Sequence, residues 1–114
     1  MDMTNPARIT FGEWLRNQRE QRNWPMRRVA AQLDVDVSII SRLETGNRQP
    51  QRDYVEKLAR IFDQDAGALL VLYLSDRIAY ELAPEGCSDE VLRAAEEKIK
   101  YLRAKNVKQG ELEF

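Results

Sequence analysis

The chain of 114 residues carries a formal net charge of −1, holds one cysteine and lacks histidine. Its length suits one compact domain with an appended element, and the single cysteine, Cys87, excludes an internal disulfide and a zinc cluster. Histidine is the commonest general base and metal ligand, so its absence argues against an enzyme, a metal site or a cofactor. No transmembrane run or signal peptide is evident, so we expect a cytoplasmic protein without a membrane partner.

The charge is distributed unevenly along the chain. Residues 1–63 hold eleven Lys and Arg against nine Asp and Glu, and ten of the eleven are Arg, whereas residues 64–114 hold seven against ten. Arg suits phosphates and guanine better than Lys does, because its guanidinium donates as a planar fork. The net charge of +2 in the first part is too small to indicate nucleic-acid binding by itself. Nucleic-acid binding must therefore be inferred from the sequence motifs.

The chain begins with a polar stretch and a first helix. Residues 1–8 include a proline and are expected to form a flexible arm. A helix is predicted from just after Thr10 to about Asn23, because Thr10 and Glu13 have the spacing of a capping box. Arg22 is expected to face solvent on this helix. The buried face is expected to contain Phe11, Trp14 and Leu15.

Residues 26–46 predict two short amphipathic helices that meet across a tight turn. Asp34 occupies the turn, since Asp tolerates a left-handed backbone. Asp36 is the expected N-cap of the second helix. The buried stripe of the first helix contains Val29, Ala30 and Leu33.

The second of these helices is predicted over residues 37–45, and Gly46 ends it. Ile40 and Leu43 lie three residues apart and face the core. At about 100° per residue, the opposite arc holds a small apolar residue, two hydroxyls and an arginine, a set suited to reading the edges of bases. These base-reading candidates are Val37, Ser38, Ser41 and Arg42. The pattern is that of a helix-turn-helix with an outward-facing recognition helix.

Three further helices are expected. The first spans residues 52–62 and covers the core. The second spans residues 66–82, where apolar side chains nearly encircle the axis, and the residues around Pro84 end it. Ser88 caps the third, which is expected to end near Lys105 before a flexible tail. This tail is predicted over residues 106–114.

About ten elements between Ile9 and Ala66 agree in type and spacing with a known family. They are Leu15, Arg19, Val29, Ala30, Leu33, Val35, the run 40–44, Gly46, Pro50, Leu58, Ala59 and Phe62. In this spacing the chain resembles the phage-repressor family of DNA-binding domains, the Cro/XRE-type helix-turn-helix, far more specifically than a lone motif would. The resemblance implies an all-α, lambda-repressor-like five-helix domain, to which the remaining residues add a C-terminal helical hairpin.

The resemblance also implies roles for particular residues. In this family the positions of Arg19 and Glu44 form an ion pair that joins the first helix to the recognition helix, so both are expected to be structural. The segment after the recognition helix lies along the DNA backbone in this family. Phosphate contacts are therefore implied for Thr45, Asn47, Arg48 and Arg52.

The junction before the helix at 26–33 departs from the family pattern. Where the family has a Ser or Thr N-cap followed by a glutamine that reaches a phosphate, this chain has Pro25 and Met26. Proline suits the start of a helix, so the fold is expected to survive, but the phosphate contact from residue 26 is lost. The backbone N–H groups of this helix start, or Arg27 or Arg28, are expected to replace it.

Beyond a helix-turn-helix domain over residues 9–66, we expect a helical dimerisation extension over residues 67–105. Its apolar surface exceeds what one face of the domain can cover, and the family reads two half-sites with paired recognition helices. We therefore expect a homodimer, although a hairpin that folds back on its own domain is the alternative. The expected interface residues are Leu72, Tyr73, Ile78, Leu92, Ile99 and Leu102.

These features predict a sequence-specific transcriptional regulator, a dimeric repressor or controller that acts at an inverted-repeat operator in the nucleoid. Small phage or plasmid repressors and controllers of restriction–modification genes are the most similar kinds. The expected partners are double-stranded DNA and a second copy, without a small-molecule ligand. Two other functions stay open: an antitoxin whose DNA binding is autoregulatory, and a protein-binding adaptor. Met26 favours the adaptor, because it replaces the phosphate-binding glutamine.

Overall fold

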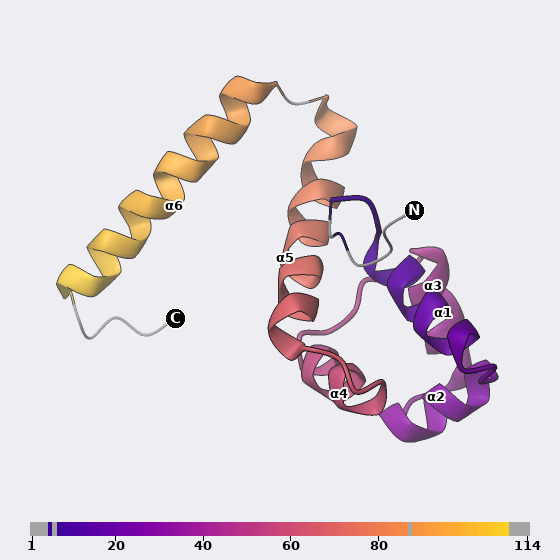
Figure 1. Ribbon diagram of the computed structural model, residues 1–114. Coiled ribbons are helices and arrows are strands. Elements are labelled where there is room, and N and C mark those ends of the chain that lie inside the picture. The colour runs from indigo at the N-terminus through magenta and orange to yellow at the C-terminus, as the bar shows by residue number, and fades with distance from the viewer. Residues whose placement is uncertain (1–4, 6, 87, 110–114) are drawn as a thin grey trace. The chain divides into compact units, whose positions relative to one another are not determined.

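A computed structural model describes residues 5, 7–86 and 88–109, with the side chains of 106–109 excepted. The fold is all-α, and α1–α5 make up a lambda-repressor-like five-helix arrangement (Figure 1). In chain order the elements are α1 (Phe11–Gln21), α2 (Met26–Leu33), α3 (Val37–Thr45), α4 (Asp53–Ile61), α5 (Ala66–Leu82), the short 3₁₀-helix η1 (Ala83–Glu85) and α6 (Asp89–Gln109). Residues 1–4 and 6 of the expected arm, residues 110–114 of the expected tail, and Cys87 lie outside the described residues.

The helix boundaries agree with the sequence prediction to within two residues except at the C-terminal end. Both α3 and α5 have the predicted bounds. The prediction that the last helix ends near Lys105 is wrong, because α6 continues to Gln109. Residues 106–109 contain neither glycine nor proline, and Gly110 is the first residue that typically ends a helix. The first four residues of the expected tail are therefore helical.

Short polar side chains fix the ends of the first three helices. Thr10 Oγ1 accepts the Glu13 N–H at 3.1 Å and Glu13 Oε1 accepts the Thr10 N–H at 2.9 Å, so the capping box is confirmed. Asp34 has a φ of 61°, which confirms the left-handed turn between α2 and α3. Asp36 Oδ1 accepts the Ser38 N–H at 2.9 Å as the N-cap of α3. This hydrogen bond holds the pKa of Asp36 below its ordinary 3.8.

One hydrophobic core joins α1, α2, α3, α4 and the first part of α5. Its largest fully buried side chains are Phe11, Phe62, Leu15, Ile40, Leu43, Leu58 and Val29. The chain divides into a unit of residues 1–79 and a unit of residues 80–114. The division falls within α5, whereas the predicted extension begins at residue 67. The first part of α5 belongs to the first unit because it supplies side chains to the core.

Two of the expected dimer-interface residues are part of this core. Leu72 is 4% exposed and Tyr73 is 5% exposed, and the Tyr73 ring packs edge-on against the ring of Phe11 at 6.4 Å. Side chains that are buried in their own domain have almost no apolar surface left for a second copy. The assignment of Leu72 and Tyr73 to a dimer interface is therefore wrong. The exposed apolar stripe of α5 consists instead of Val71, Leu74 and Ile78.

A buried carboxylate ties α5 to the start of α1. Asp76 is 7% exposed, and its Oδ2 accepts the backbone N–H of Phe11 at 2.7 Å. The N–H groups of a first helical turn lack partners within the helix, so Asp76 satisfies one of them from a distant part of the chain. Burial raises the pKa of Asp76 above its ordinary 3.8 against the opposing effect of this hydrogen bond, and the charge of Glu13 acts in the same direction as burial.

We predict that Asp76 makes the stability depend on pH in a direction unusual for a carboxylate. Because its pKa is higher in the folded state, the folded chain binds more protons than the unfolded chain between pH 3.8 and the raised pKa. The contribution is fully present below 3.8 and is lost as the pH rises through the raised value. The free energy of unfolding of the wild type, minus that of Asp76→Asn, should therefore fall as the pH rises. Chemical denaturation of both proteins at several pH values measures this difference, and a constant or rising difference would contradict the prediction.

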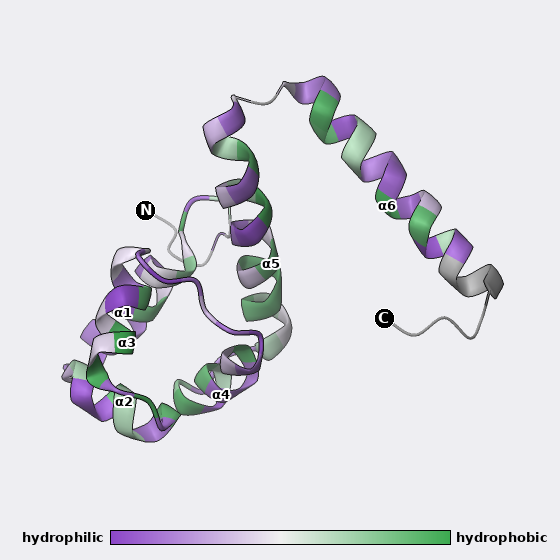
Figure 2. Ribbon diagram, turned by 180° about the vertical axis from the view of Figure 1, so that it is seen from behind, coloured by the Kyte–Doolittle hydropathy of each residue, from purple (hydrophilic) through white to green (hydrophobic). Residues whose placement is uncertain are grey.

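The second unit has a different character. It holds the end of α5, η1 and α6, and none of its described side chains is buried. Hydrophobic and hydrophilic residues alternate along α6 (Figure 2). Among the described helices, none is both long and apolar enough to cross a membrane.

Candidate nucleic-acid interface

α3 has one face in the core and one face at the surface. Ile40 and Leu43 are 0% and 2% exposed, so they anchor the helix from the inside. Of the four base-reading candidates, three are exposed and one, Ser41, is partly buried at the edge of the arc. The exposed three are Val37, Ser38 and Arg42. The helix therefore carries the predicted side chains on an outward face that its inner face holds in place.

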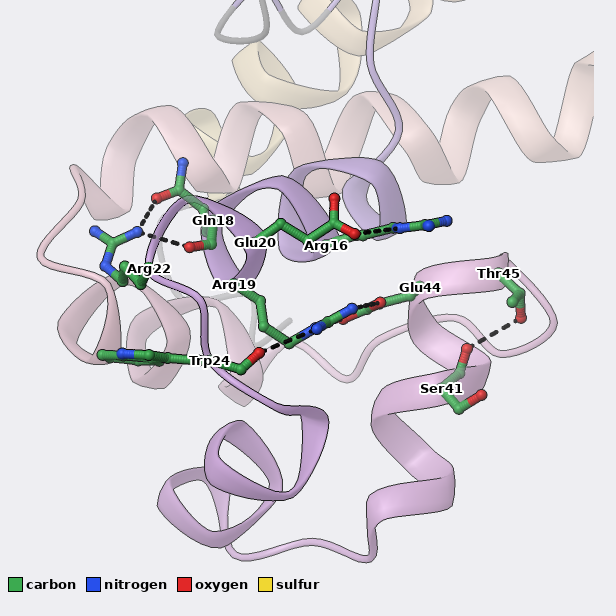
Figure 3. A network of polar contacts seen from close by, with 9 residues as sticks. All are labelled: Arg16, Gln18, Arg19, Glu20, Arg22, Trp24, Ser41, Glu44 and Thr45. Carbon is green, nitrogen blue, oxygen red and sulfur yellow. Dashed lines mark hydrogen bonds and ion pairs between the residues drawn. The ribbon is translucent and has the colours of Figure 1, made fainter.

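Arg19 on α1 binds Glu44 on α3 as a two-pronged ion pair (Figure 3). Arg19 Nε donates to Glu44 Oε2 at 2.7 Å, and Nη2 donates to Oε1 at 2.9 Å. Nη1 donates to the carbonyl oxygen of Trp24 at 3.0 Å, so one guanidinium connects α1, the α1–α2 loop and α3. The hydrogen bond to Glu44 raises the pKa of Arg19 above its ordinary value. The ion pair that the resemblance implies is thus present in the structure.

α1 approaches the C-terminal end of α3 closely at Gly12. A Cβ atom on this residue would lie well inside van der Waals contact with the carbonyl oxygen of Leu43, and 2.8 Å from that of Glu44. Backbone atoms cannot move aside as a flexible side chain can, so only a residue without a side chain fits. Gly12 therefore sets the spacing between α1 and α3.

The departure at Pro25 and Met26 leaves the start of α2 intact. Pro25 is the N-cap of α2, and the Met26 side chain is half-buried against the core. The guanidinium of Arg28 lies 4.0 Å from the centroid of the Trp24 ring, which is a cation–π contact. Arg28 is therefore already engaged within the protein, whereas Arg27 is exposed and has no partner among the described residues. Of the two proposed replacements for the lost glutamine, Arg27 is the better placed.

Arg22 also holds the first unit together, so the expectation that it faces solvent is wrong. Its Nη2 donates to the carbonyl oxygen of Phe62 at 2.7 Å, and its Nη1 donates to that of Gln18 at 2.9 Å. The Trp24 ring stacks on the Phe62 ring at 5.5 Å, beside this guanidinium. The carbonyl groups that end α1 and α4 supply acceptors that the helix pattern alone does not show.

The loop after α3 holds the remaining phosphate candidates. The hydroxyl of Thr45 donates back into α3, to the carbonyl oxygen of Ser41 at 3.1 Å (Figure 3), so its one proton is already used. Asn47 and Arg52 are exposed. Arg48 is half-buried. Its backbone N–H donates to the carbonyl oxygen of Arg42 at 3.2 Å, which holds the loop beside the end of α3. Asn47, Arg48 and Arg52 retain side-chain donors for a phosphate.

Gly12 and Asp76 are not among the predicted site residues, although both fix the position of α1. A glycine inside a helical pattern is a recognised sign of close backbone approach, so Gly12 carried a usable signal. Asp76 is an acid in the interior of the apolar helix of residues 66–82, which indicates a buried polar partner. The identity of that partner, the Phe11 N–H, depends on the tertiary fold.

The comparisons agree with this arrangement. A family model described as a helix-turn-helix domain matches residues 10–71. The match begins at the N-cap of α1 and includes α2, its turn and α3, and it covers more than half of the chain. No curated protein and no solved structure matches the chain. The chain therefore belongs to the helix-turn-helix family of DNA-binding domains.

Proposed function

We propose that the protein is a Cro/XRE-type transcriptional regulator that binds an inverted-repeat operator as a homodimer. It acts in the cytoplasm, where it represses or controls the genes beside the operator, as small phage repressors and restriction–modification controllers do. The observation that carries the proposal is the exposed arc of α3, which is anchored by Ile40, Leu43 and the Arg19–Glu44 pair. A recognition helix needs such an anchor, because base contacts require a fixed angle of entry into the major groove.

The exposed side chains of α3 suit direct reading of base edges. The guanidinium of Arg42 can donate to guanine O6 and N7 together, which is the commonest specific contact between protein and DNA. Ser38 can donate to or accept from a base, and Val37 can pack on a thymine methyl group. Ser41, at the edge of the arc, suits a base or a neighbouring phosphate.

Contacts to phosphates would hold α3 in register on the duplex. The first N–H groups of α2 have no partner within the helix, and the positive end of the helix dipole favours an anion there. Arg27 lies in this first turn, and Asn47, Arg48 and Arg52 follow α3 on the other side of it. Contacts of this kind position the protein but carry no sequence information by themselves.

We predict that Arg42→Ala relaxes sequence preference at one position of each half-site. The lost bidentate contact should reduce discrimination there by about 1–3 kcal/mol, while the other positions keep their preference. The measurement is selection from random duplexes at low salt, followed by titration of the wild type and the variant with the selected site and its single-base variants. A uniform loss of affinity across all sequences would instead make Arg42 a phosphate contact.

Arg60→Ala is the matched control for the Arg42 experiment. Arg60 is an exposed arginine in the last turn of α4, so its removal changes the net charge by the same amount. Arg60 is neither a base-reading nor a phosphate-binding candidate, so the sequence preference of Arg60→Ala should equal that of the wild type. If the wild type enriches no sequence at all, the proposed operator binding is wrong.

A further inference from the structure

α6 carries an apolar seam with the spacing of a coiled coil. Leu92 and Ile99 occupy equivalent positions seven residues apart. Ala95 follows Leu92 by three residues, and Leu102 follows Ile99 by three residues. This is the a/d pattern over two heptads, in which successive intervals of three and four residues keep one stripe on one side of the helix. The exposed fractions are 46% for Leu92, 42% for Ile99 and 51% for Leu102. The seam is therefore uncovered, and none of the described side chains around it is buried.

We propose that the α6 seam pairs with the same seam of a second copy, and that the two helices run antiparallel. This inference rests on the proposed dimeric regulator and names the surface that joins its two copies. The sizes of the seam residues favour this direction. With the pair centred at Glu97, Leu92 faces Leu102 of the second copy, and Ala95 faces Ile99 of the second copy.

The antiparallel arrangement fills space better than the parallel one. Each small Ala95 meets a large Ile99, and the same contact is repeated by symmetry, so the layers differ less in volume than they would in a parallel pair. In a parallel pair Ala95 would face Ala95 of the second copy, and this layer would leave a gap between two larger layers. A gap in an apolar interface forfeits van der Waals contacts without admitting water.

The charges beside the seam favour the same direction. In the antiparallel pair, Asp89 lies beside Arg103 of the second copy at both ends of the interface, which gives two attractive contacts. Near the centre Glu96 meets Glu96 and Lys98 meets Lys98, but each Glu96 already has Lys100 as an ion-pair partner at 3.6 Å within its own helix. In a parallel pair, Lys98 would lie beside Arg103 of the second copy on both sides. Over residues 89–105 the parallel arrangement thus gives repulsion without an attractive pair.

The seam offers a matched pair of variants. Ile99→Glu places a carboxylate in the middle of the interface, whereas Tyr101→Glu places the same group on the opposite side of α6, where Tyr101 is 64% exposed. Neither residue is buried in its own chain, so both variants should retain the wild-type melting curve of the first unit. We expect sedimentation equilibrium without DNA to show a dimer for the wild type and Tyr101→Glu. The dissociation constant of Ile99→Glu should rise more than about 100-fold.

Thiol cross-linking tests the direction of the helices. In a Cys87→Ser background, a cysteine at Lys98 lies close to its counterpart only in the antiparallel pair. A cysteine at Leu92 lies close to its counterpart only in the parallel pair, since the antiparallel one separates the two by about 15 Å along the axis. We expect a short bifunctional thiol reagent to cross-link Lys98→Cys and not Leu92→Cys. The opposite result, a monomeric wild type, or an unchanged dimer in Ile99→Glu would overturn the proposal.

These experiments separate the failure of this inference from the failure of the proposed function. Dimerisation is measured without DNA, and operator binding is measured by selection. A monomer that enriches a DNA sequence overturns the α6 pairing and leaves α3 as a recognition helix. A dimer that cross-links through Lys98→Cys but enriches no sequence supports the pairing and overturns the proposed regulator.

Discussion

Replacing Gly12 by alanine is expected to lower the free energy of unfolding by about 3 kcal/mol, although alanine is the better helix former. The new Cβ would overlap the carbonyl oxygen of Leu43 and lie 2.8 Å from that of Glu44. Both are backbone atoms near the end of α3, so α1 or α3 must shift as a whole. Such a shift also disturbs the Arg19–Glu44 pair, which joins the same two helices. Thermal denaturation should show a fall in melting temperature of about 12 °C or more.

Gly67→Ala is the control for this substitution. Gly67 is exposed in the first turn of α5, and a Cβ there would meet only the Asp65 side chain, at 3.3 Å. Alanine at this position should leave the melting temperature within a few degrees of the wild type or raise it slightly. If Gly12→Ala melts like Gly67→Ala, the spacing of α1 and α3 is not set by Gly12. Loss of DNA affinity in Gly12→Ala alone would connect this spacing to recognition.

The helix-turn-helix was predictable because its determinants are local. The capping box at Thr10, the left-handed Asp34 and the N-cap at Asp36 each depend on residues within a few positions. The inward pair of Ile40 and Leu43 follows from helical period alone, and it leaves the opposite arc for recognition. Local propensity, capping and apolar pattern agree throughout this stretch, which is the condition under which sequence reasoning succeeds.

The buried face of α5 could not be predicted in the same way, because it depends on contacts between distant parts of the chain. α5 has apolar residues on nearly all sides, so its pattern does not tell which side enters the core. The core uses Leu72 and Tyr73, and Asp76 reaches the Phe11 N–H from the same side, which leaves Val71, Leu74 and Ile78 exposed.

Arg22 illustrates the same limit from the polar side. Its acceptors include the carbonyl oxygen of Phe62, forty residues away in sequence. The position of an arginine in a helix shows where its charge begins, but it does not show which carbonyl groups the fold brings near the guanidinium. The exposed position that the helix pattern gave for Arg22 was therefore wrong.

Arg19→Ala is expected to have the largest effect of any side-chain truncation in the site, a loss of about 3–5 kcal/mol in the free energy of unfolding. The Glu44 side chain is 3% exposed, so removal of its partner leaves a carboxylate buried without a counter-charge. The carbonyl oxygen of Trp24 loses a donor at the same time. Arg19→Lys should recover only part of the loss, because an ammonium group cannot donate through the planar fork that binds both carboxylate oxygens. Urea denaturation of the wild type, Arg19→Lys and Arg19→Ala measures the three free energies of unfolding, which should decrease in this order.

The Arg16–Glu20 pair on the same helix is a matched control. It is also an Arg–carboxylate contact, at 3.1 Å, but its side chains are 64% and 55% exposed, so Arg16→Ala should change stability too little to resolve. Equal effects of Arg16→Ala and Arg19→Ala would contradict the structural role of Arg19.

The apolar double variant Arg19→Met with Glu44→Leu removes both charges, so it should regain most of the lost stability. If the ion pair orients α3, this variant will be stable and yet bind the selected DNA more weakly than the wild type. Full recovery of both properties would show that α3 needs only a packed contact at this point, whatever its chemistry.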